Sequence, residues 1–256
     1  MAFKIKFNWK RELTITVVIA SVFFFIAFSE RKQGSVAVKD VQIKIENIEN
    51  NHFLDEQDVT SLMDLKEENL KGASREKVDL RMLEARIKKS GFVKDADLYS
   101  DLKGNIVVRV ELRRPIARMV RNDGPDGYIA EDGAVMPTTE KFSARVVLVS
   151  GSYVSRLLRE KNITSTEEGM KLMELLNKIR NDEFWAAQIA QLDIDSRCRI
   201  TIYPQVGGQE IIFGKPEDID TKLMKLRIFF KKILPQMGWN KYKQVNLEFE
   251  GQIVAE

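Results

Sequence analysis

The chain has 256 residues, 44% apolar and 31% charged, which is enough to build a buried core in one large domain or two small ones. Its formal charge of +3 comes from the start of the chain, because the residues after position 29 include 37 basic and 37 acidic side chains. A nucleic-acid-binding domain normally carries a basic surface, so this balance disfavours DNA or RNA as a partner. Cys198 is the single cysteine, which excludes an intramolecular disulfide and therefore a disulfide-stapled secreted scaffold.

An uncharged segment lies near the start of the chain, where residues 13–28 read LTITVVIASVFFFIAF. As a helix this segment would be about 24 Å long, the short end of what spans a bilayer. We predict a transmembrane helix over residues 13–29, with the basic residues 1–12 in the cytoplasm and the rest of the chain outside. A cleaved signal peptide is the alternative, because Ala27-Phe28-Ser29 resembles a cleavage site, but the uncharged run is longer and bulkier than such peptides usually are.

The residue pattern after the predicted membrane span indicates one strand, two helices and two further strands. Residues 41–48 alternate as a strand, Asp55 precedes a first helix, and residues 80–89 form a second helix with Asp79 as its cap and Gly91 as a left-handed stop. Residues 93–99 and 105–113 flank a turn and read as a strand pair. We expect both helices to pack on one face of a three-stranded sheet.

From residue 117 the pattern changes to short strands, turns and two longer helices. The predicted strands cover residues 145–149, 189–194, 199–203 and 210–213. Ser165 and Glu168 form a capping-box pattern that opens one helix, and a second helix runs over residues 219–234 and stops before Pro235. Three Asp-Gly pairs between residues 123 and 133 indicate turns, and their spacing does not match a calcium loop.

The last predicted strand covers residues 242–253, with Val245, Leu247 and Phe249 on one face. A strand at the end of a chain is often the edge of a sheet, where free backbone groups can pair with a strand of another protein. The alternative is an interior strand that takes no partner.

Residues for enzymatic chemistry are not found in the sequence. His52 is the only histidine, which excludes a two-histidine metal site, and neither a GxxxxGK[ST] phosphate loop nor a GxGxxG motif after a strand occurs. We therefore predict no catalytic residue, no metal and no cofactor, and we expect the protein not to be an enzyme.

Residues 91–117 resemble the end of the POTRA domain in the FtsQ/DivIB family of bacterial cell-division proteins. The resemblance lies in Gly91-Phe92-Val93, in the strand over residues 106–110, and in the run ELRRPIA at residues 111–117, which is similar to the family's Glu-Arg-x-Pro-x-Ala signature with Leu112 as an extra residue. Residues 128–133 resemble the family's Asp-x-x-Gly hairpin. Phe213-Gly214 followed by Lys222-Leu223 is similar to its strand, glycine and lysine-bearing helix.

This resemblance implies an α+β protein with a single N-terminal transmembrane helix in the bacterial inner membrane. It implies a cytoplasmic tail at residues 1–12, a β-α-α-β-β POTRA domain at residues 38–114, and at residues 115–256 a mixed α/β domain built on an antiparallel sheet with a C-terminal edge strand. Arg113, Arg114 and Pro115 would form the junction of the two domains, since proline ends strand pairing and keeps the chain extended.

The resemblance also implies a function, that of a non-enzymatic divisome scaffold at the septum. Its partners would be FtsL-like and FtsB- or DivIC-like single-span proteins, and it would help to control septal peptidoglycan synthesis. The expected partner-binding residues are Lys243, Gln244, Val245, Asn246, Leu247, Glu248, Phe249 and Gln252. The alternative is an exported, membrane-anchored POTRA-type binding or assembly protein that takes no part in division.

Overall fold

The computed structural model describes residues 13–24, 37–48, 51–63 and 70–256 of the chain. Residues 13–24, which lie inside the predicted membrane span, form a helix with exposed apolar side chains such as Phe23. Within these described residues no helix is both long and apolar enough to cross a membrane. The remainder of the predicted span, residues 25–29, and the predicted cytoplasmic tail, residues 1–12, lie outside them.

The described residues divide into two compact units. The first takes its residues from Met1–Lys44, Glu56–Lys88 and Ala96–Val110, and the second from Ile45–Asp55, Lys89–Asp95 and Glu111–Glu256. Together they contain helices and two sheets, which confirms the predicted α+β class.

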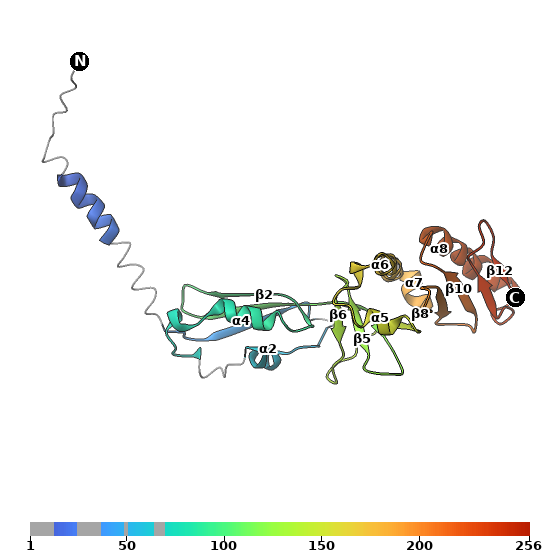
Figure 1. The fold of residues 1–256 in the computed structure, drawn as a ribbon, viewed down its shortest axis with the longest axis horizontal. Coiled ribbons are helices and arrows are strands. Elements are labelled where there is room, and N and C mark those ends of the chain that lie inside the picture. Colours follow the sequence, from blue (N-terminus) through green and yellow to red (C-terminus); the bar gives the residue numbers. More distant parts are fainter. Residues whose placement is uncertain (1–12, 25–36, 49–50, 64–69) are drawn as a thin grey trace, which may run out of the picture. The chain divides into compact units, whose positions relative to one another are not determined.

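The N-terminal sheet has three strands in the order β1-β3-β2, with β1 at Val41–Glu46, β2 at Val93–Ser100 and β3 at Ile106–Leu112 (Figure 1). Between β1 and β2 the chain forms α2 (Glu56–Leu62), the short 3-10 helix η1 (Arg75–Lys77) and α4 (Leu80–Ile87). The predicted order of strand, two helices and two strands is therefore confirmed. The prediction succeeds because α2 and α4 each carry an apolar stripe, which the sequence shows directly. Val59, Leu83 and Ile87 of these stripes are buried.

The two ends of α4 differ in how well they were predicted. The Asp79 carboxylate accepts a hydrogen bond of 3.0 Å from the Met82 N–H, which confirms the predicted cap. The backbone of Gly91 is not in the left-handed conformation that was predicted. The helix instead ends at Lys88, whose backbone has right-handed helical angles. A Cβ at Gly91 would lie 2.7 Å from Pro137 Cδ, so this glycine serves a close approach and not a helix stop.

The second unit is built on a nine-stranded sheet in the order β12-β11-β10-β9-β8-β7-β4-β5-β6. Its strands are β4 (Pro115–Met119), β5 (Gly127–Ala130), β6 (Val135–Pro137), β7 (Val147–Ser150), β8 (Ile189–Ile194), β9 (Ile200–Pro204), β10 (Glu210–Gly214), β11 (Gln244–Asn246) and β12 (Val254–Ala255). The sheet is mixed and not antiparallel as predicted, because β4/β7, β7/β8 and β10/β11 pair in parallel. Helices connect β7 to β8 and β10 to β11, and such crossovers bring strands together in parallel.

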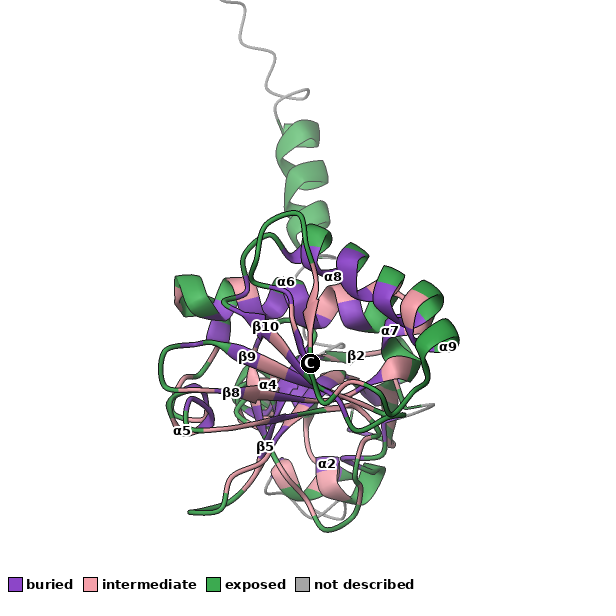
Figure 2. Cartoon of the chain, turned by 90° about the vertical axis from the view of Figure 1, so that its right-hand side faces the viewer, coloured by how far each residue is buried: buried purple, intermediate pink, exposed green. Residues whose placement is uncertain are grey.

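Helices cover one side of strands β8–β10 (Figure 2). They are α6 (Glu167–Asn181), α7 (Glu183–Gln188), α8 (Ile219–Ile228), the π-helix η3 (Phe229–Ile233) and α9 (Leu234–Met237), while α5 (Val154–Leu157) and the 3-10 turn η2 (Ile163–Ser165) follow β7. Buried residues of α6 and α8, such as Leu175 and Leu226, belong to the same core as Ile202 of β9 and Phe213 of β10. This core fixes α8 over the C-terminal half of the sheet.

Two predicted helix ends differ in the structure. Thr166 and not Ser165 caps α6, since its hydroxyl accepts from the Gly169 N–H at 3.1 Å and Ser165 belongs to the preceding 3-10 turn. Pro235 lies within α9 and not past the end of the helix. The π turn just before it bonds Leu234 N–H to Phe229 O, and such a wider turn lets a helix accommodate a residue that lacks an N–H.

Candidate partner-binding surface

The C-terminal segment forms a hairpin of two short strands. The prediction of one strand over residues 242–253 is wrong, because β11 ends at Asn246 and β12 begins at Val254. Gly251 lies in the turn between them at φ 70°, a left-handed conformation that glycine adopts without strain. β11 pairs in parallel with β10 and antiparallel with β12, so β12 is the outer strand of this edge (Figure 1).

The hairpin brings the eight predicted partner-binding residues together, but it does not expose them equally. Val245 and Leu247 are fully buried in the core, whereas 47% of the Phe249 surface is exposed. Of the remaining five, Lys243, Gln244, Glu248 and Gln252 are exposed and Asn246 is half-buried. Val245 and Leu247 therefore hold the strand in place, and Phe249 is the large apolar side chain that a partner can cover.

The pairing of the two strands determines which backbone groups face outward. Gln244 and Glu256 exchange two hydrogen bonds, of 3.1 Å and 3.0 Å. In an antiparallel pair such residues alternate with residues whose N–H and C=O point away from the partner strand. The N–H and C=O of Ala255 therefore point to the open side of β12, which has no neighbouring strand among the described residues.

The side chain of Lys225 in α8 binds the turn of this hairpin through hydrogen bonds. Only 9% of this residue is exposed. Its Nζ donates to the backbone carbonyls of Leu247 at 2.6 Å, Phe249 at 2.7 Å and Gln252 at 3.4 Å. An ammonium group has three donors and no acceptor, so three converging carbonyls match it fully. Lys225 thus fixes the chain from the end of β11 to the approach of β12.

Lys222, one turn earlier in α8, is also 9% exposed. Its Nζ donates to the Lys215 carbonyl at 2.8 Å and lies 5.0 Å from the centre of the Phe213 ring. Burial lowers the pKa of this ammonium below its ordinary value, although Glu248 acts in the opposite direction. The Glu248 side chain lies against Gly214, where a Cβ would come within 2.4 Å of its Oε1. The glycine makes room for Glu248 beside β10.

The role of Lys225 was missed from the sequence, although a signal was present. Lys222 and Lys225 fall among Leu226 and Phe229 on the side of α8 that faces the core. A charged side chain on the apolar stripe of a helix needs an internal partner, since burying an unpaired charge is costly. The partners of Lys225 are carbonyls more than twenty residues away, and sequence periodicity does not reveal them.

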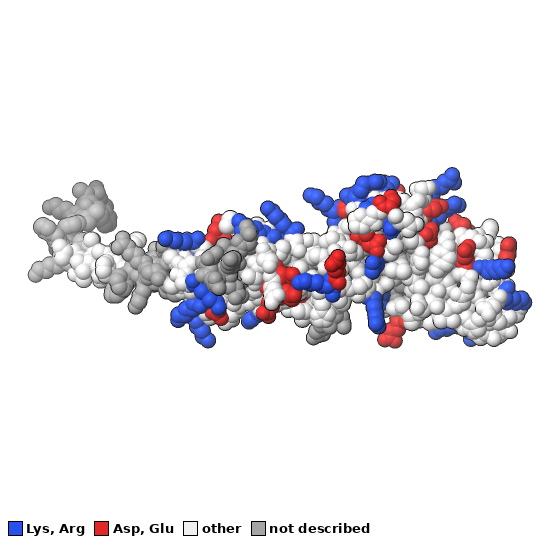
Figure 3. All heavy atoms as spheres, turned by 90° about the horizontal axis from the view of Figure 1, so that it is seen from below, with Lys and Arg blue, Asp and Glu red and all other residues white. Residues whose placement is uncertain are grey.

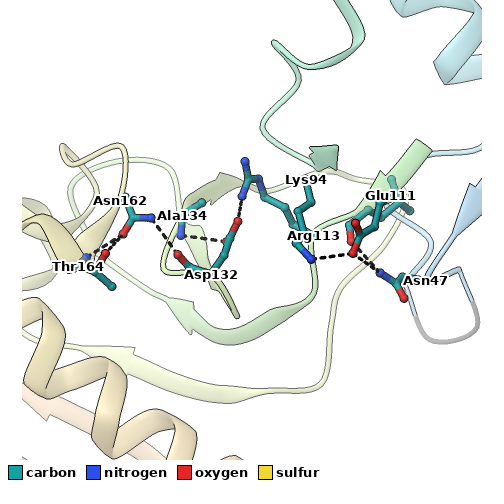
Figure 4. A network of polar contacts seen from close by, with 9 residues as sticks. Asn47, Lys94, Glu111, Arg113, Asp132, Ala134, Asn162 and Thr164 are labelled. Atoms are coloured by element: carbon teal, nitrogen blue, oxygen red, sulfur yellow. Dashed lines mark hydrogen bonds and ion pairs between the residues drawn. The ribbon is translucent and has the colours of Figure 1, made fainter. Parts of the chain in front are cut away.

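Arg113, the first of the predicted junction residues, lies in a polar network within the second unit (Figure 4). The Arg113 guanidinium forms an ion pair with Asp132. The backbone carbonyl of Arg113 accepts a hydrogen bond of 2.7 Å from Asn51 Nδ2. Arg114 donates to the Asn47 side chain. Pro115 is the first residue of β4, a position where a strand tolerates its missing N–H. The side chains of Asn47 and Asn51 are thereby tied to the chain entering the large sheet.

An aromatic cluster lies in the same unit as this network. Phe53 is 1% exposed, stacks on Phe92 at 5.2 Å, and meets the edges of Tyr128 at 5.3 Å and Phe142 at 5.0 Å. Such ring pairs contribute roughly 0.5–1.5 kcal/mol each beyond the area that they bury. Residues 53 and 92 are therefore held firmly to β5 and to the segment before β7.

Comparison with protein families assigns the larger part of the chain. A model of the family described as FtsQ/DivIB, C-terminal related, matches residues 114–256, more than half of the sequence. The chain belongs to the FtsQ/DivIB family. A model of the POTRA-like domain matches residues 37–111, and the comparison with curated proteins gave no match. The resemblance seen in the sequence is thus confirmed.

Membership of the FtsQ/DivIB family carries a general function. FtsQ/DivIB and POTRA domains are non-catalytic scaffold domains, and the family implies a cell-division scaffold that acts through protein–protein interactions in the divisome. The family also implies association with the membrane at the division site.

The family's hairpin motif after the POTRA domain forms the turn between β5 and β6. Gly133 adopts φ 79° and donates to the Ala130 carbonyl at 2.9 Å. Asp132 Oδ1 accepts from the Ala134 N–H at 3.2 Å (Figure 4). A Cβ at Gly133 would lie 2.6 Å from Asn162 Oδ1, so both the left-handed backbone and the close neighbour require glycine. The same Asp132 binds Arg113, which links this FtsQ/DivIB motif to the ELRRPIA run.

Groups suited to metal chemistry or nucleophilic attack do not converge in the described part of this FtsQ/DivIB protein. Among those residues no three His, Cys, Asp or Glu side chains come together as a metal site. Cys198 is 7% exposed, and burial raises the pKa of its thiol, which disfavours the reactive thiolate. On the face seen in Figure 3, Lys and Arg are interspersed with Asp and Glu and form no continuous basic surface.

Proposed function

We propose that this protein is a non-enzymatic, single-pass membrane scaffold of the bacterial divisome that binds an FtsB- or DivIC-like partner, together with an FtsL-like protein, by strand addition at β12. The observation that carries the proposal is the open outer side of β12, where the N–H and C=O of Ala255 face away from β11. Phe249 adds an exposed aromatic side chain beside this edge. Strand addition takes affinity from backbone bonds and specificity from the flanking side chains.

The membrane anchor belongs to the same proposal. We assign residues 13–29 to one inner-membrane span, residues 1–12 to the cytoplasm, residues 38–114 to the POTRA domain and residues 115–256 to the partner-binding domain outside the cytoplasm. The exposed apolar side chains of helical residues 13–24 support the span, because lipid would cover them. Arg113, Arg114 and Pro115 are proposed as the junction of the two domains, and the septum as the site of action, where the scaffold helps to control peptidoglycan synthesis.

Substitutions at Ala255 test strand addition. Ala255→Pro removes the outward N–H without breaking a bond to β11, whereas the matched Ala255→Val keeps the N–H and adds bulk. In pull-downs with the tagged full-length protein, Ala255→Pro should retain about fivefold less FtsB-like partner, which corresponds to the loss of one backbone bond of about 1 kcal/mol. Ala255→Val should bind within about twofold of the wild type. Equal retention by Ala255→Pro and the wild type would rule out strand addition at β12.

Two cellular experiments test the wider assignment. Reporters fused before residue 1 and after residue 256 should lie on opposite sides of the membrane, and their appearance on one side would refute the single span. Depletion of the protein should give filaments blocked before constriction. Normal division on depletion would refute the divisome role, even if the topology proved correct.

A further inference from the structure

A second candidate site lies in a cavity of about 930 Å³ within the second unit. Its charged lining is basic among the residues that the structure describes: Arg114, Arg145 and Arg180 contribute to it, His52 lies beside them, and none of these described lining residues is Asp or Glu. Ile45, Ile48, Phe142 and Val146 supply apolar walls. Cavities of this size with apolar walls and a few convergent polar groups are typical of ligand sites.

The arginines of the cavity are not all neutralised. Arg180 pairs with Glu131 at 3.0 Å, and Arg114 also lowers the pKa of this carboxylate while its guanidinium contacts the uncharged Asn47 side chain. Arg145 is exposed and makes no hydrogen bond or ion pair with any described residue. The described side chains of the cavity, three arginines against Glu131, therefore carry an excess of positive charge, and a planar guanidinium suits bidentate pairing with a carboxylate.

Asn51 gives an independent indication of a ligand. It is 3% exposed and lines the cavity, and its Nδ2 donates to the Arg113 carbonyl at 2.7 Å. Its Oδ1 is buried and has no hydrogen-bond partner among the described residues. A buried acceptor without a partner destabilises the protein, so a ligand that donates an N–H to it would bind more tightly.

The segment between Phe142 and Val146 favours a peptide over a small anion. Ala144 N–H donates to the Tyr128 hydroxyl at 3.3 Å, whereas the N–H groups of Ser143 and Arg145 have no partner in the described part of the chain. A peptide can use these backbone groups, the apolar walls and the arginines together, while a phosphate or acetate ion fills only a small part of about 930 Å³. We infer that this cavity binds an acidic peptide segment of a partner protein, with a carboxylate on Arg145 and Arg114 and a backbone N–H on Asn51 Oδ1.

The test uses the detergent-solubilised full-length chain and two fluorescein-labelled decapeptides, one of alternating Glu and Val and one of alternating Lys and Val. Fluorescence anisotropy should show binding of the acidic peptide only, and added salt should weaken it, since screening acts on exposed charges. Arg145→Glu should weaken binding at least about tenfold, because it replaces an attractive charge by a repulsive one. Arg159→Glu, an equal charge change at an exposed residue outside the cavity, should leave binding unchanged.

Three outcomes would overturn the inference. Equal binding of the two peptides would show no preference for acid, and equal effects of Arg145→Glu and Arg159→Glu would place binding elsewhere. Full displacement of the acidic peptide by inorganic phosphate or acetate, measured at constant ionic strength, would show that the cavity binds small anions and not a peptide. Ala255→Pro, which blocks β12, should not change peptide binding, so failure here and failure of strand addition at β12 are separate results.

Discussion

Replacing Lys225 by methionine should loosen the C-terminal hairpin without unfolding the rest of the second unit. Methionine matches the length of the lysine stem and keeps its contacts with the core, but it cannot donate to the carbonyls of Leu247, Phe249 and Gln252. The substitution therefore removes the polar anchor of the turn and little else.

The size of the effect follows from the three hydrogen bonds. Bonds from a charged donor contribute roughly 1.5–3 kcal/mol each, so the two short ones, at 2.6 and 2.7 Å, give about 3–6 kcal/mol together. Methionine avoids the cost of burying an ammonium ion, which offsets part of this loss. We expect a net loss of about 2–3 kcal/mol in the local free energy of opening, or about a 30- to 150-fold increase in the open population.

Amide hydrogen exchange measures this opening directly. The N–H groups of Lys243, Gln244 and Glu256 donate within the hairpin and should exchange about 30- to 150-fold faster in Lys225→Met. The Gln205 N–H, which bonds to Gln188 O away from the hairpin, should keep its wild-type rate. The matched control is Lys232→Met, which removes an exposed lysine of η3, the π-helix that follows α8. This variant should leave the exchange of the hairpin amides unchanged.

Two results would refute the reasoning about Lys225. Wild-type exchange of the hairpin amides in Lys225→Met would mean that the lysine does not anchor the turn. Faster exchange of the Gln205 amide by the same factor would mean that the lysine stabilises the whole unit and not the hairpin.

Three further predictions concern pH and packing. Burial lowers the pKa of Lys222 in the folded state, so stability should rise as the pH increases from that lowered value towards the ordinary 10.5, and Lys222→Met should abolish this rise in chemical denaturation. The hydrogen bond from Arg180 lowers the pKa of Glu131, so the ionised Glu131 should stabilise the fold fully above pH 4.5 and lose this effect as the pH falls through the lowered pKa. In denaturation experiments at acid pH, Glu131→Gln should therefore flatten the loss of stability. Phe53→Ala should destabilise the second unit by about 3–5 kcal/mol in urea titrations, and a loss below about 1 kcal/mol would contradict the packing argument.

The N-terminal sheet and its helices could be predicted well, because local patterns decide them. β3 shows this clearly, since Ile106, Val108, Val110 and Leu112 alternate in the sequence and all four are buried. The Asp79 cap acts over three residues and was likewise readable from the sequence. Such features need no knowledge of distant contacts.

The C-terminal surface could be predicted only in part. The alternation of Val245, Leu247 and Phe249 continues past the end of β11, so the pattern hid the turn that Glu250 and Gly251 form. Parallel pairing of β10 with β11 depends on the intervening helices, and the role of Lys225 depends on carbonyls that approach it only in the folded chain. The sequence proposed the residues of the candidate surface, whereas their burial and the identity of the outer strand required the structure.

The dimensions of β12 bear on how a partner can bind tightly to such a short edge. Ala255, and Ile253 before it in the same alternation, offer two N–H and two C=O groups. At roughly 1 kcal/mol each these four groups give about 4 kcal/mol, no more than the lowest estimate of about 4–15 kcal/mol for the loss of free motion on association. Backbone pairing at β12 therefore sets the register and only offsets the cost of association, so side chains must add the remaining affinity. Phe249, the large exposed apolar residue of the hairpin, is placed to supply it, so Phe249→Ala should reduce partner affinity by about 2 kcal/mol or more. An effect below about 0.5 kcal/mol on the measured Kd would mean that the partner reaches past the hairpin for its affinity.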